Sequence, residues 1–498
     1  MKPDEAAMNA PRALKRRDKR YWEDRHVVVV GAGLSGVAAA RLLLDCGALV
    51  TLNDARPEAE ISAAISANDL ADLREGGATL LAGGHPDTLW RDAQTAVFSP
   101  GIRPDAPVVA AAQRSGIEIV AEIEVAADLV EAPIIAITGS NGKSTVTSMV
   151  GAILAAAGLR APVCGNIGTA LSAAARAEVL DNKRPDAYVV EISSFQAHGI
   201  DHFRPQLATI LNIQPDHIDW HGTMEAYAAA KLRMVRNMGA GDTIVYNQDD
   251  TGLVGRLPRR GADLVPFAYQ PAELAPPLAW VADGHIWWWA AGGERQPLIA
   301  VDELGVIGPH NQANACAAAA LASLFGIAEQ SVARGLAGYR GLQHRMERCG
   351  DIDGVCCIND SKATNVAATV AALQGFDHGV WLILGGRDKG ADFAQLLPVL
   401  DHRIGGILLI GEASGAIAAA LAAAPARVPE PSLCETLEGA MDRALASASP
   451  GDTILLSPAC TSFDQYPDFE QRGRHFKALV TARAAGRGGT PEPLMEAP

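Results

Sequence analysis

A glycine turn that leads into Gly-Lys-Ser is the clearest chemical signal in the sequence. It comprises Thr138-Gly-Ser-Asn-Gly-Lys-Ser-Thr145, between an apolar run at 134–137 and an apolar segment of helical length at 146–159. In a strand, turn and helix of this kind, backbone N–H groups bind phosphate oxygens, the lysine reaches the outer phosphates and the hydroxyl ligates Mg²⁺. Ile137 replaces the first glycine of the common pattern. We predict a phosphate loop of a particular subtype, because a chance Gly-Lys-Ser would not need this order of elements.

Polar residues follow two further apolar runs that we predict to be strands of the same sheet. Glu191 lies in the end of the run 187–192, and His217 follows the run 207–212. An acid at the carboxyl tip of a strand beside a phosphate loop is suited to bind Mg²⁺, and we prefer this role to that of a solvent-exposed edge acid. We favour a ligand or Mg²⁺ role for His217 and a structural role for His221.

Two helices carry further candidates. Lys231 lies among alanines at 226–233, where burial would leave it partly neutral and able to take up CO₂ as a carbamate. From the residues alone, a solvated helix lysine remains the favoured interpretation. Asn311 and Asn314 are three residues apart and share a helix face, where they could bind an adenine edge or cap the helix.

The first strand of the chain runs into a second glycine turn. Val27–Val30 precede Gly31-Ala-Gly-Leu-Ser-Gly36, and the strand after the next helix ends at Asp54. This is a dinucleotide-binding pattern. The pattern does not identify one ligand, because the glycines allow the backbone to approach any diphosphate and the acid can accept hydrogen bonds from any sugar or base. NAD, FAD and a UDP-sugar all remain open.

These residues must be positioned by several domains, since 498 residues suggest about three. We predict an α/β fold with a Rossmann-like N-terminal domain, a central P-loop-type ATPase domain with a mostly parallel sheet, and a Rossmann-like C-terminal domain. The predicted bounds are 1–25 for a disordered leader, 26–122, 123–341 and 342–484 for the domains, and 485–498 for a flexible tail.

Charge and cysteine usage narrow the class of protein. The net charge of −15 argues against general nucleic-acid binding, which needs a basic surface. The eight cysteines form no C-x-x-C pair, which favours reduced thiols in the cytoplasm. The first 25 residues lack an apolar signal segment. We expect neither nucleic acid nor a membrane as a partner, and we expect a monomer.

The C-terminal third places four polar or glycine-rich loops after predicted strands, which makes that edge of the sheet a predicted binding edge. Leu278–Ile299, with Trp287-Trp-Trp289, has the pattern of hairpin strands. It could be an excursion of the central domain or a partner surface. The four loops are 359–365, 385–390, 411 and 457–462.

Four motifs in this order resemble the Mur ligase superfamily, over about 27–480. They are 138–145, Glu191-Ile-Ser-Ser-Phe-Gln196, Asn359-Asp-Ser-Lys-Ala-Thr-Asn365 and Leu456-Ser-Pro-Ala-Cys460. The third is similar to the D-glutamate-adding branch. The resemblance implies ATP-dependent addition of D-glutamate to UDP-N-acetylmuramoyl-L-alanine through an acyl phosphate, in cytoplasmic peptidoglycan precursor synthesis. Ala55 departs from the pattern, since the family has a hydroxyl there that meets uracil.

The resemblance implies a role for each matching residue. Lys143, Glu191, His217 and Lys231 would be catalytic, with ATP and two Mg²⁺ ions as cofactors and Lys231 as a carbamate. The metal would be held by Ser144, Glu191, His217 and Lys231. ATP would be bound by Gly139, Ser140, Asn141, Gly142, Lys143, Ser144, Thr145, Asn311, Asn314, Arg345 and Asp360. The substrates would be bound by Leu34, Ser35, Asp54, Arg56, Asn166, Ser193, Thr364, Lys389, Ser462 and Phe469.

Three other functions remain open from the sequence. A sibling Mur ligase or a folylpolyglutamate-type ligase would add another amino acid, and 359–365 discriminates against it. An NAD-binding oxidoreductase built on Gly31–Gly36 would leave the phosphate loop unexplained. A regulatory module would hydrolyse ATP without ligation.

Overall fold

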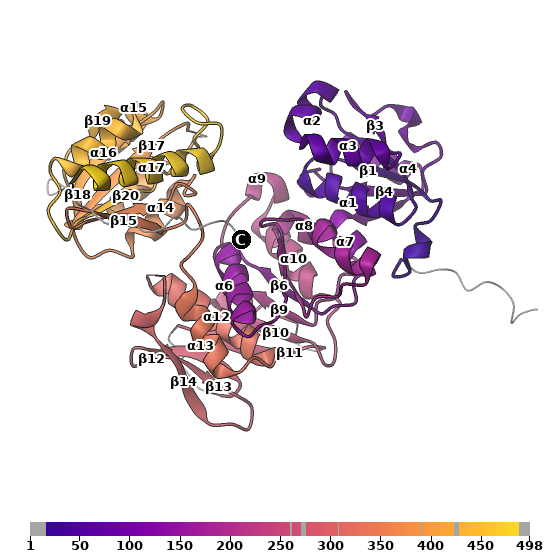
Figure 1. Cartoon of the computed structure of the whole chain (residues 1–498), viewed down its shortest axis with the longest axis horizontal. Helices are drawn as coiled ribbons and strands as arrows, with labels where there is room; N and C mark the ends of the chain where they lie inside the picture. The colour runs from indigo at the N-terminus through magenta and orange to yellow at the C-terminus, as the bar shows by residue number, and fades with distance from the viewer. Residues whose placement is uncertain are drawn as a thin grey trace, which may run out of the picture. The chain divides into compact units, whose positions relative to one another are not determined.

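The computed structural model describes residues 16–258, 261–269, 275–306, 308–388, 390–422 and 428–487. These residues form two compact units. The first unit runs to Leu304 and includes His310–Gly338, and the second contains Gly305–Pro309 and begins again at Tyr339. The first unit holds two β-sheets and the second unit holds one, as Figure 1 shows.

The first sheet is entirely parallel, with the strand order β3-β2-β1-β4-β5. Its central strand, β1, is a run of valines buried on both faces, which is typical of a strand covered by helices on each side. The strands are β1 (His26–Val30), β2 (Leu49–Asn53), β3 (Thr79–Leu81), β4 (Thr95–Phe98) and β5 (Glu118–Ala121). The helices are η2 (Lys19–Tyr21), α1 (Leu34–Asp45), α2 (Glu58–Ala64), α3 (Ala67–Glu75), η3 (Asp87–Trp90) and α4 (Pro107–Arg114).

The central sheet has the order β14-β13-β12-β11-β10-β9-β6-β8-β7 and is parallel from β7 to β12. Its strands are β6 (Ile134–Thr138), β7 (Val163–Gly165), β8 (Tyr188–Glu191), β9 (Leu207–Ile210), β10 (Thr243–Asn247), β11 (Asp263–Ala268), β12 (Leu278–Ala282), β13 (His285–Trp289) and β14 (Arg295–Ala300). Its helices are α6 (Lys143–Ala156), α7 (Leu171–Asp181), α8 (Ser194–His198), α9 (Ile218–His221), α10 (Met224–Leu232), η4 (Arg233–Val235), α11 (Thr251–Val254), η5 (Val301–Glu303), α12 (Pro309–Leu324) and α13 (Glu329–Gly338).

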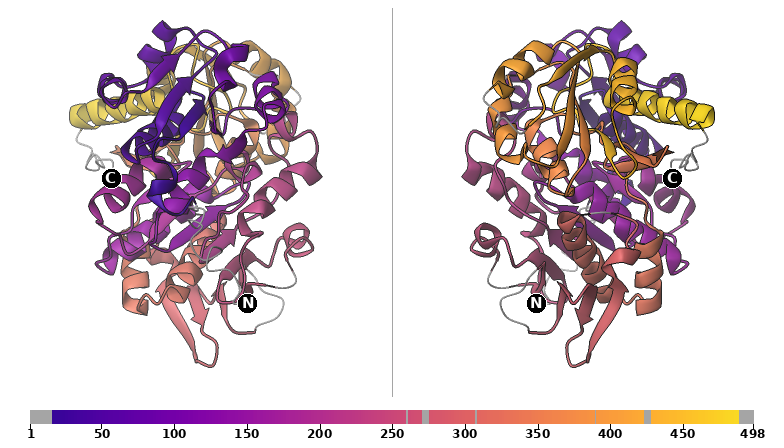
Figure 2. Two further views of the ribbon diagram at one scale, coloured as in Figure 1. Left: turned by 90° about the vertical axis from the view of Figure 1, so that its right-hand side faces the viewer. Right: turned by 90° about the vertical axis from the view of Figure 1, so that its left-hand side faces the viewer.

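The third sheet has the order β15-β16-β20-β17-β18-β19, and only β15 runs antiparallel to its neighbour. The long helix α17 is drawn in yellow in Figure 2. The strands are β15 (Glu347–Ile352), β16 (Val355–Asn359), β17 (Val380–Gly385), β18 (Ile404–Ile410), β19 (Ser432–Glu435) and β20 (Thr453–Leu456). The helices are α14 (Val366–Leu373), η6 (Phe393–Val399), α15 (Ser414–Leu421), α16 (Leu437–Leu445) and α17 (Phe469–Arg487).

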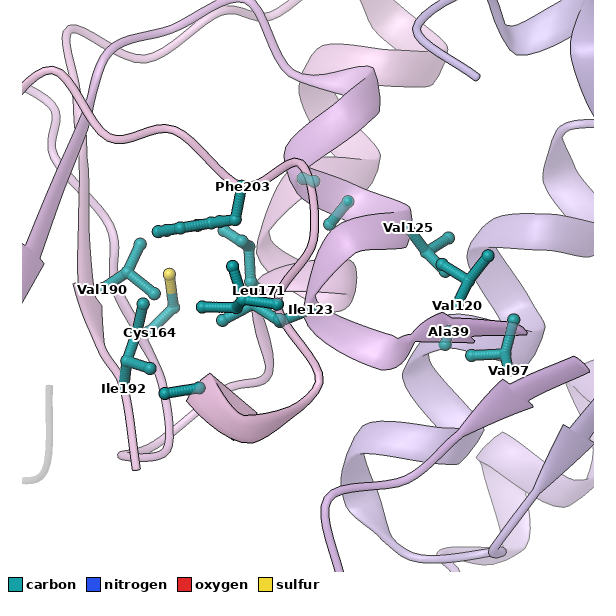
Figure 3. Packing of buried hydrophobic residues seen from close by; sticks show 14 of the residues in the cluster. Ala39, Val97, Val120, Ile123, Val125, Cys164, Leu171, Val190, Ile192 and Phe203 are labelled. Atoms are coloured by element: carbon teal, nitrogen blue, oxygen red, sulfur yellow. The ribbon is translucent and has the colours of Figure 1, made fainter. Parts of the chain in front are cut away.

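The predicted α/β class with mostly parallel sheets is confirmed by these three sheets. The first two sheets share one hydrophobic core, and helix α5 (Glu122–Leu129) lies between them in sequence. Figure 3 shows Ile123 of α5 beside Leu171 of the central sheet's helices, and Val125 of α5 beside Val120 of the first sheet. The exact domain bounds stay predictions.

The leader differs from the prediction of disorder over 1–25. Residues 1–15 lie outside the described residues, but Asp18 caps a short 3₁₀ helix and Trp22 is fully buried. Arg16 forms ion pairs with Glu124 at 3.6 Å and Asp128 at 3.1 Å, both on α5. The buried Trp22 and the ion pairs of Arg16 hold residues 16–25 in place. Neither contact can be predicted from the composition of the segment.

Two further predictions concern the tail and the tryptophan hairpin. Helix α17 continues to Arg487, past the predicted start of the tail at 485, and residues 488–498 lie outside the described residues. The hairpin prediction is confirmed, and β12 joins β11 in parallel, so the hairpin extends the central sheet. No helix in the described part of the chain has both the length and the apolar character to cross a membrane.

Candidate active site

The phosphate loop lies where β6 ends and α6 begins, at the carboxyl edge of the central sheet. The first-turn N–H groups of α6 have no acceptor within the helix, so they can bind an anion. Gly142 has a φ of +83°, and a Cβ atom there would lie 2.5 Å from Oδ1 of Asn314. A Cβ atom at Gly139 would lie 2.9 Å from Cβ of Leu211. Backbone conformation and close packing therefore require both glycines of the predicted turn.

The remaining predicted loop residues all lie in this turn. Ser140 donates from Oγ to the carbonyl oxygen of Gln214 at 2.9 Å. Asn141 is exposed at the tip of the loop, and Ser144 and Thr145 are buried in the first turn of α6. Ser144 therefore lies in the first turn of the helix that follows the glycine turn, and its role as a metal ligand stays a prediction.

Two lysines converge on one carbonyl oxygen of this loop. Nζ of Lys143 lies 2.9 Å from the carbonyl oxygen of Gly139, and Nζ of Lys231 lies 2.7 Å from the same atom. Lys143 also donates to the carbonyl oxygen of Ser140 at 2.8 Å. Its position four residues from Gly139 lets it fold back over the loop, where an outer phosphate could replace the carbonyl acceptors.

Lys231 corrects the interpretation based on its residue type alone. It is 1% exposed rather than solvated, and it lies 4.7 Å from the ring centroid of the buried Tyr227. Burial, and secondly the charge of Lys143, lower the pKa of Lys231 to about 6. At neutral pH the amine is therefore largely unprotonated and nucleophilic.

Glu191 ends β8 directly beside the phosphate loop, because the parallel register pairs it with Ile137 of β6. Its Oε1 atom accepts from Nδ2 of Asn166 at 2.6 Å. Its Oε2 atom is buried and has no hydrogen-bond partner among the described residues. A buried carboxylate oxygen without a partner is costly, so this atom is suited to a metal ion.

His217 follows the central strand β9 and is the N-cap of α9 with a φ of +51°. Its ring packs against Phe195 at 4.8 Å between centroids, and its Nε2 atom lies 3.5 Å from Oδ2 of Asp216. His221 lies deeper in the same aromatic group and its Nε2 atom is 3.0 Å from Oγ of Ser194. The half-exposed ring of His217 is accessible to a ligand, and the contacts of His221 agree with a structural role.

The residues present fit a phosphate-bound Mg²⁺, although no His, Cys, Asp or Glu group of three among the described side chains could hold a metal alone. A buried Glu191 oxygen lacks a partner among the described residues, and Ser144 lies in the first turn of α6, which follows the strand that pairs with β8. Mg²⁺ commonly takes one or two protein ligands and completes its shell with phosphate oxygens and water.

The predicted adenine residues lie on α12 within the same unit. Nδ2 of Asn314 donates to Oδ1 of Asn311 at 3.3 Å, as their spacing on one helix face allows. Asn314 also packs against Gly142. Helix α12 therefore meets the start of α6, with Asn314 next to the phosphate loop and Asn311 hydrogen-bonded to Asn314.

The first sheet brings Asp54 and Arg56 together at the end of β2. Asp54 accepts from the backbone N–H of Ala32 at 2.7 Å and from Nη2 of Arg56 at 2.8 Å. The hydrogen bond from Arg56 is the largest of the causes that lower the pKa of Asp54 to about 2. The carboxylate is thus occupied by a guanidinium, and the cation faces the glycine turn.

Leu34 and Ser35 begin α1 directly after that turn, and the Leu34 side chain is 79% exposed. An exposed leucine at a helix start in a glycine turn is available to a planar ligand. Ser193 is the N-cap of α8 and forms a capping box with Gln196. Its hydroxyl therefore already has a structural role.

In the second unit, Arg345 lies between His344 and Met346, which have φ values of +62° and +47°. The loop is fixed by Asp360, whose Oδ1 accepts from the N–H of Met346 at 3.2 Å and whose Oδ2 accepts from Oγ of Ser457 at 2.8 Å. Burial raises the pKa of Asp360 to about 6. Non-glycine residues with a left-handed backbone on both sides of Arg345 indicate local backbone strain, which is common at functional sites.

The predicted amino-acid site lies at the carboxyl edge of the third sheet. Ser462 is buried after β20, and Thr364 follows β16. Phe469 begins α17, and Nζ of Lys362 lies 5.5 Å from its ring centroid. Lys389 lies outside the described residues.

Arg472 is a buried residue that sequence reasoning missed. Its guanidinium is 1% exposed and donates to the carbonyl oxygens of Ser361 at 2.9 Å and Cys460 at 3.1 Å. It thus ties the loops after β16 and β20 together. A single arginine in a helix gives no signal of this role, because its acceptors lie on loops elsewhere in the sequence.

Comparison with known proteins gives matches over most of the chain. Three family models match: "Mur ligase MurD-like, N-terminal domain" over 25–121, "Mur ligase middle domain" over 137–322, and "Mur ligase, glutamate ligase domain" over 344–460. The UDP-N-acetylmuramoylalanine–D-glutamate ligase of Myxococcus xanthus is 41% identical over 92% of this chain and 98% of its own length. That of Acidobacterium capsulatum is 39% identical over 92% and 96%.

Among solved structures, a pseudomurein peptide ligase type C from Methanothermus fervidus matches with a TM-score of 0.55. It is 19% identical and the match covers 92% of this chain and 100% of that one. At this identity the similarity establishes the fold alone.

Proposed function

The chain belongs to the Mur ligase family, and from this premise we propose that it adds D-glutamate to UDP-N-acetylmuramoyl-L-alanine, with conversion of ATP to ADP and phosphate, in peptidoglycan precursor synthesis. The names of relatives about 40% identical over most of the chain support the substrates. The observation that carries the chemistry is the convergence of Lys143 and Lys231 on the carbonyl oxygen of Gly139, beside the partnerless Oε2 of Glu191.

The reaction must activate a carboxylate before an amine can attack it. A carboxylate oxygen of the UDP-linked substrate attacks the γ-phosphorus of ATP, and the bond to ADP breaks. The resulting acyl phosphate is attacked at its carbonyl carbon by the amino group of D-glutamate. The amide bond forms, a proton leaves the nitrogen, and phosphate leaves with the former carboxylate oxygen.

The chain's part is to bring two anions together and to stabilise the phosphoryl group in transit. Lys143 would leave its carbonyl acceptors and bind the outer phosphates, while the start of α6 holds the inner ones. Two Mg²⁺ ions would supply charge neutralisation between the triphosphate and the carboxylate. We propose that they are held by Ser144, Glu191, His217 and Lys231, the last as a carbamate.

The remaining predicted residues receive proposed roles in binding. The UDP-linked substrate would contact Leu34, Ser35, Asp54, Arg56, Asn166 and Ser193. The adenine end of ATP would contact Asn311 and Asn314, with Arg345 and Asp360 near the nucleotide. D-glutamate would contact Thr364, Lys389, Ser462 and Phe469. We propose that the chain acts as a monomer in the cytoplasm, where ATP and UDP-linked precursors are found.

One contact in the first sheet weighs against an NAD-binding oxidoreductase. In that class the acid after the second strand binds a ribose hydroxyl pair. Here Asp54 is already bound by Arg56 through two nitrogens, Nε at 3.0 Å and Nη2 at 2.8 Å. The cation thereby held at the turn suits an anionic ligand such as a nucleotide diphosphate.

The proposal is tested by measuring phosphate release with ATP, Mg²⁺ and UDP-N-acetylmuramoyl-L-alanine. D-glutamate, L-glutamate, L-lysine and meso-diaminopimelate are compared as amino-acid substrates. Release with D-glutamate alone is expected. Release with another amino acid would keep the ligase chemistry and overturn the specificity, and no release with any of the four would overturn the function.

A further inference from the structure

A short segment after β9 holds the phosphate loop from the side. We call Asn212–Gln214 the strap. The strap begins two residues after Ile210, which is paired in register with Thr138 at the end of β6. Its position next to the loop is therefore set by the two adjacent strands of the sheet.

The Asn212 side chain binds both backbone groups of one loop residue. Its Oδ1 atom accepts from the N–H of Asn141 at 2.8 Å, and its Nδ2 atom donates to the carbonyl oxygen of Asn141 at 3.2 Å. An asparagine amide presents one acceptor and one donor side by side, which matches the two polar groups of a single residue's backbone. Asn212 thus clamps the tip of the loop as a neighbouring strand would.

The rest of the strap closes around the neighbouring loop residue. The N–H of Ser140 donates to the carbonyl oxygen of Asn212 at 2.9 Å. Oγ of Ser140 accepts from the N–H of Gln214 at 2.8 Å and donates to the carbonyl oxygen of Gln214 at 2.9 Å. Two successive loop residues are therefore fixed by the strap immediately before the glycine that starts α6.

The two hydrogen bonds from Asn212 hold the peptide groups of Asn141 in one orientation. Asn141 is exposed, so without Asn212 its peptide groups could turn toward water or into the space above α6. Gly142 follows with a left-handed φ of +83°, a conformation that glycine can leave at little cost. A flexible glycine next to an unrestrained tip would allow the loop to adopt several shapes.

We propose that Asn212 is a positioning residue that fixes the phosphate loop in its nucleotide-binding shape and so sets the affinity for ATP. This inference rests on the proposed function, since it needs a nucleotide at the loop. Asn212 itself would contact neither the phosphates nor the metal. The strap continues into His217, so one segment sets the loop and presents that histidine.

The test is the affinity of the full chain for MgADP, measured by calorimetric titration, in native protein and Asn212→Ala. Loss of the two hydrogen bonds, partly transmitted to the loop, is expected to weaken binding about tenfold. The KM for ATP should rise by a similar factor, while the KM values for the UDP-linked substrate and D-glutamate stay within about twofold.

Asn237→Ala is the matched control. Nδ2 of Asn237 also binds two backbone atoms, the carbonyl oxygens of Asp201 at 2.8 Å and Phe203 at 3.0 Å, on a loop outside the proposed site. Both variants should lower the melting temperature, but only Asn212→Ala should weaken MgADP. If the alanine variant does not fold, Asn212→Gln, which keeps both polar groups without a new charge but moves them by one methylene, is used and should also bind MgADP more weakly.

A folded Asn212 variant that binds MgADP with native affinity would overturn the positioning role. Equal weakening by Asn237→Ala would overturn it as well, because the effect would then be one of general stability. Native protein that binds no MgADP would instead refute the proposed function, and the inference with it.

Discussion

Lys143 and Lys231 donate to the same carbonyl oxygen, that of Gly139, at 2.9 and 2.7 Å. One lysine comes from the loop itself and the other from α10, 88 residues further along the chain. Two ammonium groups at this separation would repel each other, and Lys231 is also buried. Burial, and secondly the charge of Lys143, lower the pKa of Lys231 to about 6, which favours a neutral amine beside the Lys143 ammonium at neutral pH.

A neutral buried amine is the form that reacts with CO₂. The nitrogen lone pair attacks the carbon, a proton leaves, and a carbamate with one negative charge results. We predict that Lys231→Ala loses activity by at least about a hundredfold, as expected for a lost metal ligand. Added formate or acetate should restore part of it by placing a carboxylate in the cavity. Steady-state rates with and without these anions measure the effect, and full activity without any addition would disprove the carbamate.

The lowered pKa also predicts how stability depends on pH. Between about pH 6 and 10.5 the unfolded chain binds more protons at Lys231 than the folded chain, so the free energy of unfolding rises with pH. Lys231→Met removes this contribution. In nucleotide-free and CO₂-free buffer, the variant should exceed native protein in stability most at pH 6.5 and least at pH 9, with a change of up to about 1.4 kcal/mol per pH unit.

Urea unfolding at several pH values measures this difference. Lys183, whose side chain is 65% exposed, provides the control. Lys183→Met should shift stability equally at both pH values. A Lys231→Met difference that is independent of pH would mean that the buried amine is not titrating in this range.

Glu191→Gln should abolish the response to Mg²⁺ without harm to the fold. The substitution replaces a buried oxygen that has no protein partner, so the melting temperature should not fall. Activity should drop at least about a hundredfold, since metal stabilisation of the transferring group contributes several kcal/mol. Rates across a Mg²⁺ titration provide the measurement.

Glu178→Gln serves for comparison, because Glu178 is also buried, its Oε2 atom also has no hydrogen-bond partner among the described residues, and its Oε1 atom accepts from the backbone N–H of Glu131 at 2.8 Å. It should leave the Mg²⁺ dependence intact. Native Mg²⁺ dependence in Glu191→Gln would remove Glu191 from the metal site.

Alanine variants at the two ends of α6 can distinguish an effect on nucleotide binding from an effect on helix stability. Gly142 and Gly158 have similar φ values, +83° and +79°, so alanine is strained at both by about 1–2 kcal/mol. A Cβ atom at Gly142 would meet Asn314, whereas one at Gly158 has nothing within 4 Å. Both alanine variants should melt earlier, and only Gly142→Ala should raise the KM for ATP, by about tenfold or more. An equal KM in the two variants would contradict the placement of the nucleotide.

The features predicted correctly from the sequence are those encoded locally. The turn from β6 to α6 is encoded by glycines and a Lys-Ser pair, and the position of Glu191 by a strand that ends there. The parallel register then brings them together, since Ile137 pairs with Glu191. Local patterns suffice because carboxyl ends of parallel strands meet at one edge.

The features that were missed depend on tertiary packing. Alanines around Lys231 are compatible with burial or exposure, and only the packing of α10 against α8 decides between the two. Trp22 enters the core from a segment whose composition predicts disorder. Asn212 and Arg472 act on backbone atoms, which carry no sequence signal.

The most direct measurement is the fate of oxygen in the substrate carboxylate. UDP-N-acetylmuramoyl-L-alanine labelled with ¹⁸O in that carboxylate is incubated with ATP, Mg²⁺ and D-glutamate, and the released phosphate is analysed by mass spectrometry. Attack of the carboxylate on ATP predicts that each phosphate carries one ¹⁸O atom from the substrate. Unlabelled phosphate would show that water cleaves ATP, and that the lysines at Gly139 do not serve an acyl-phosphate ligase.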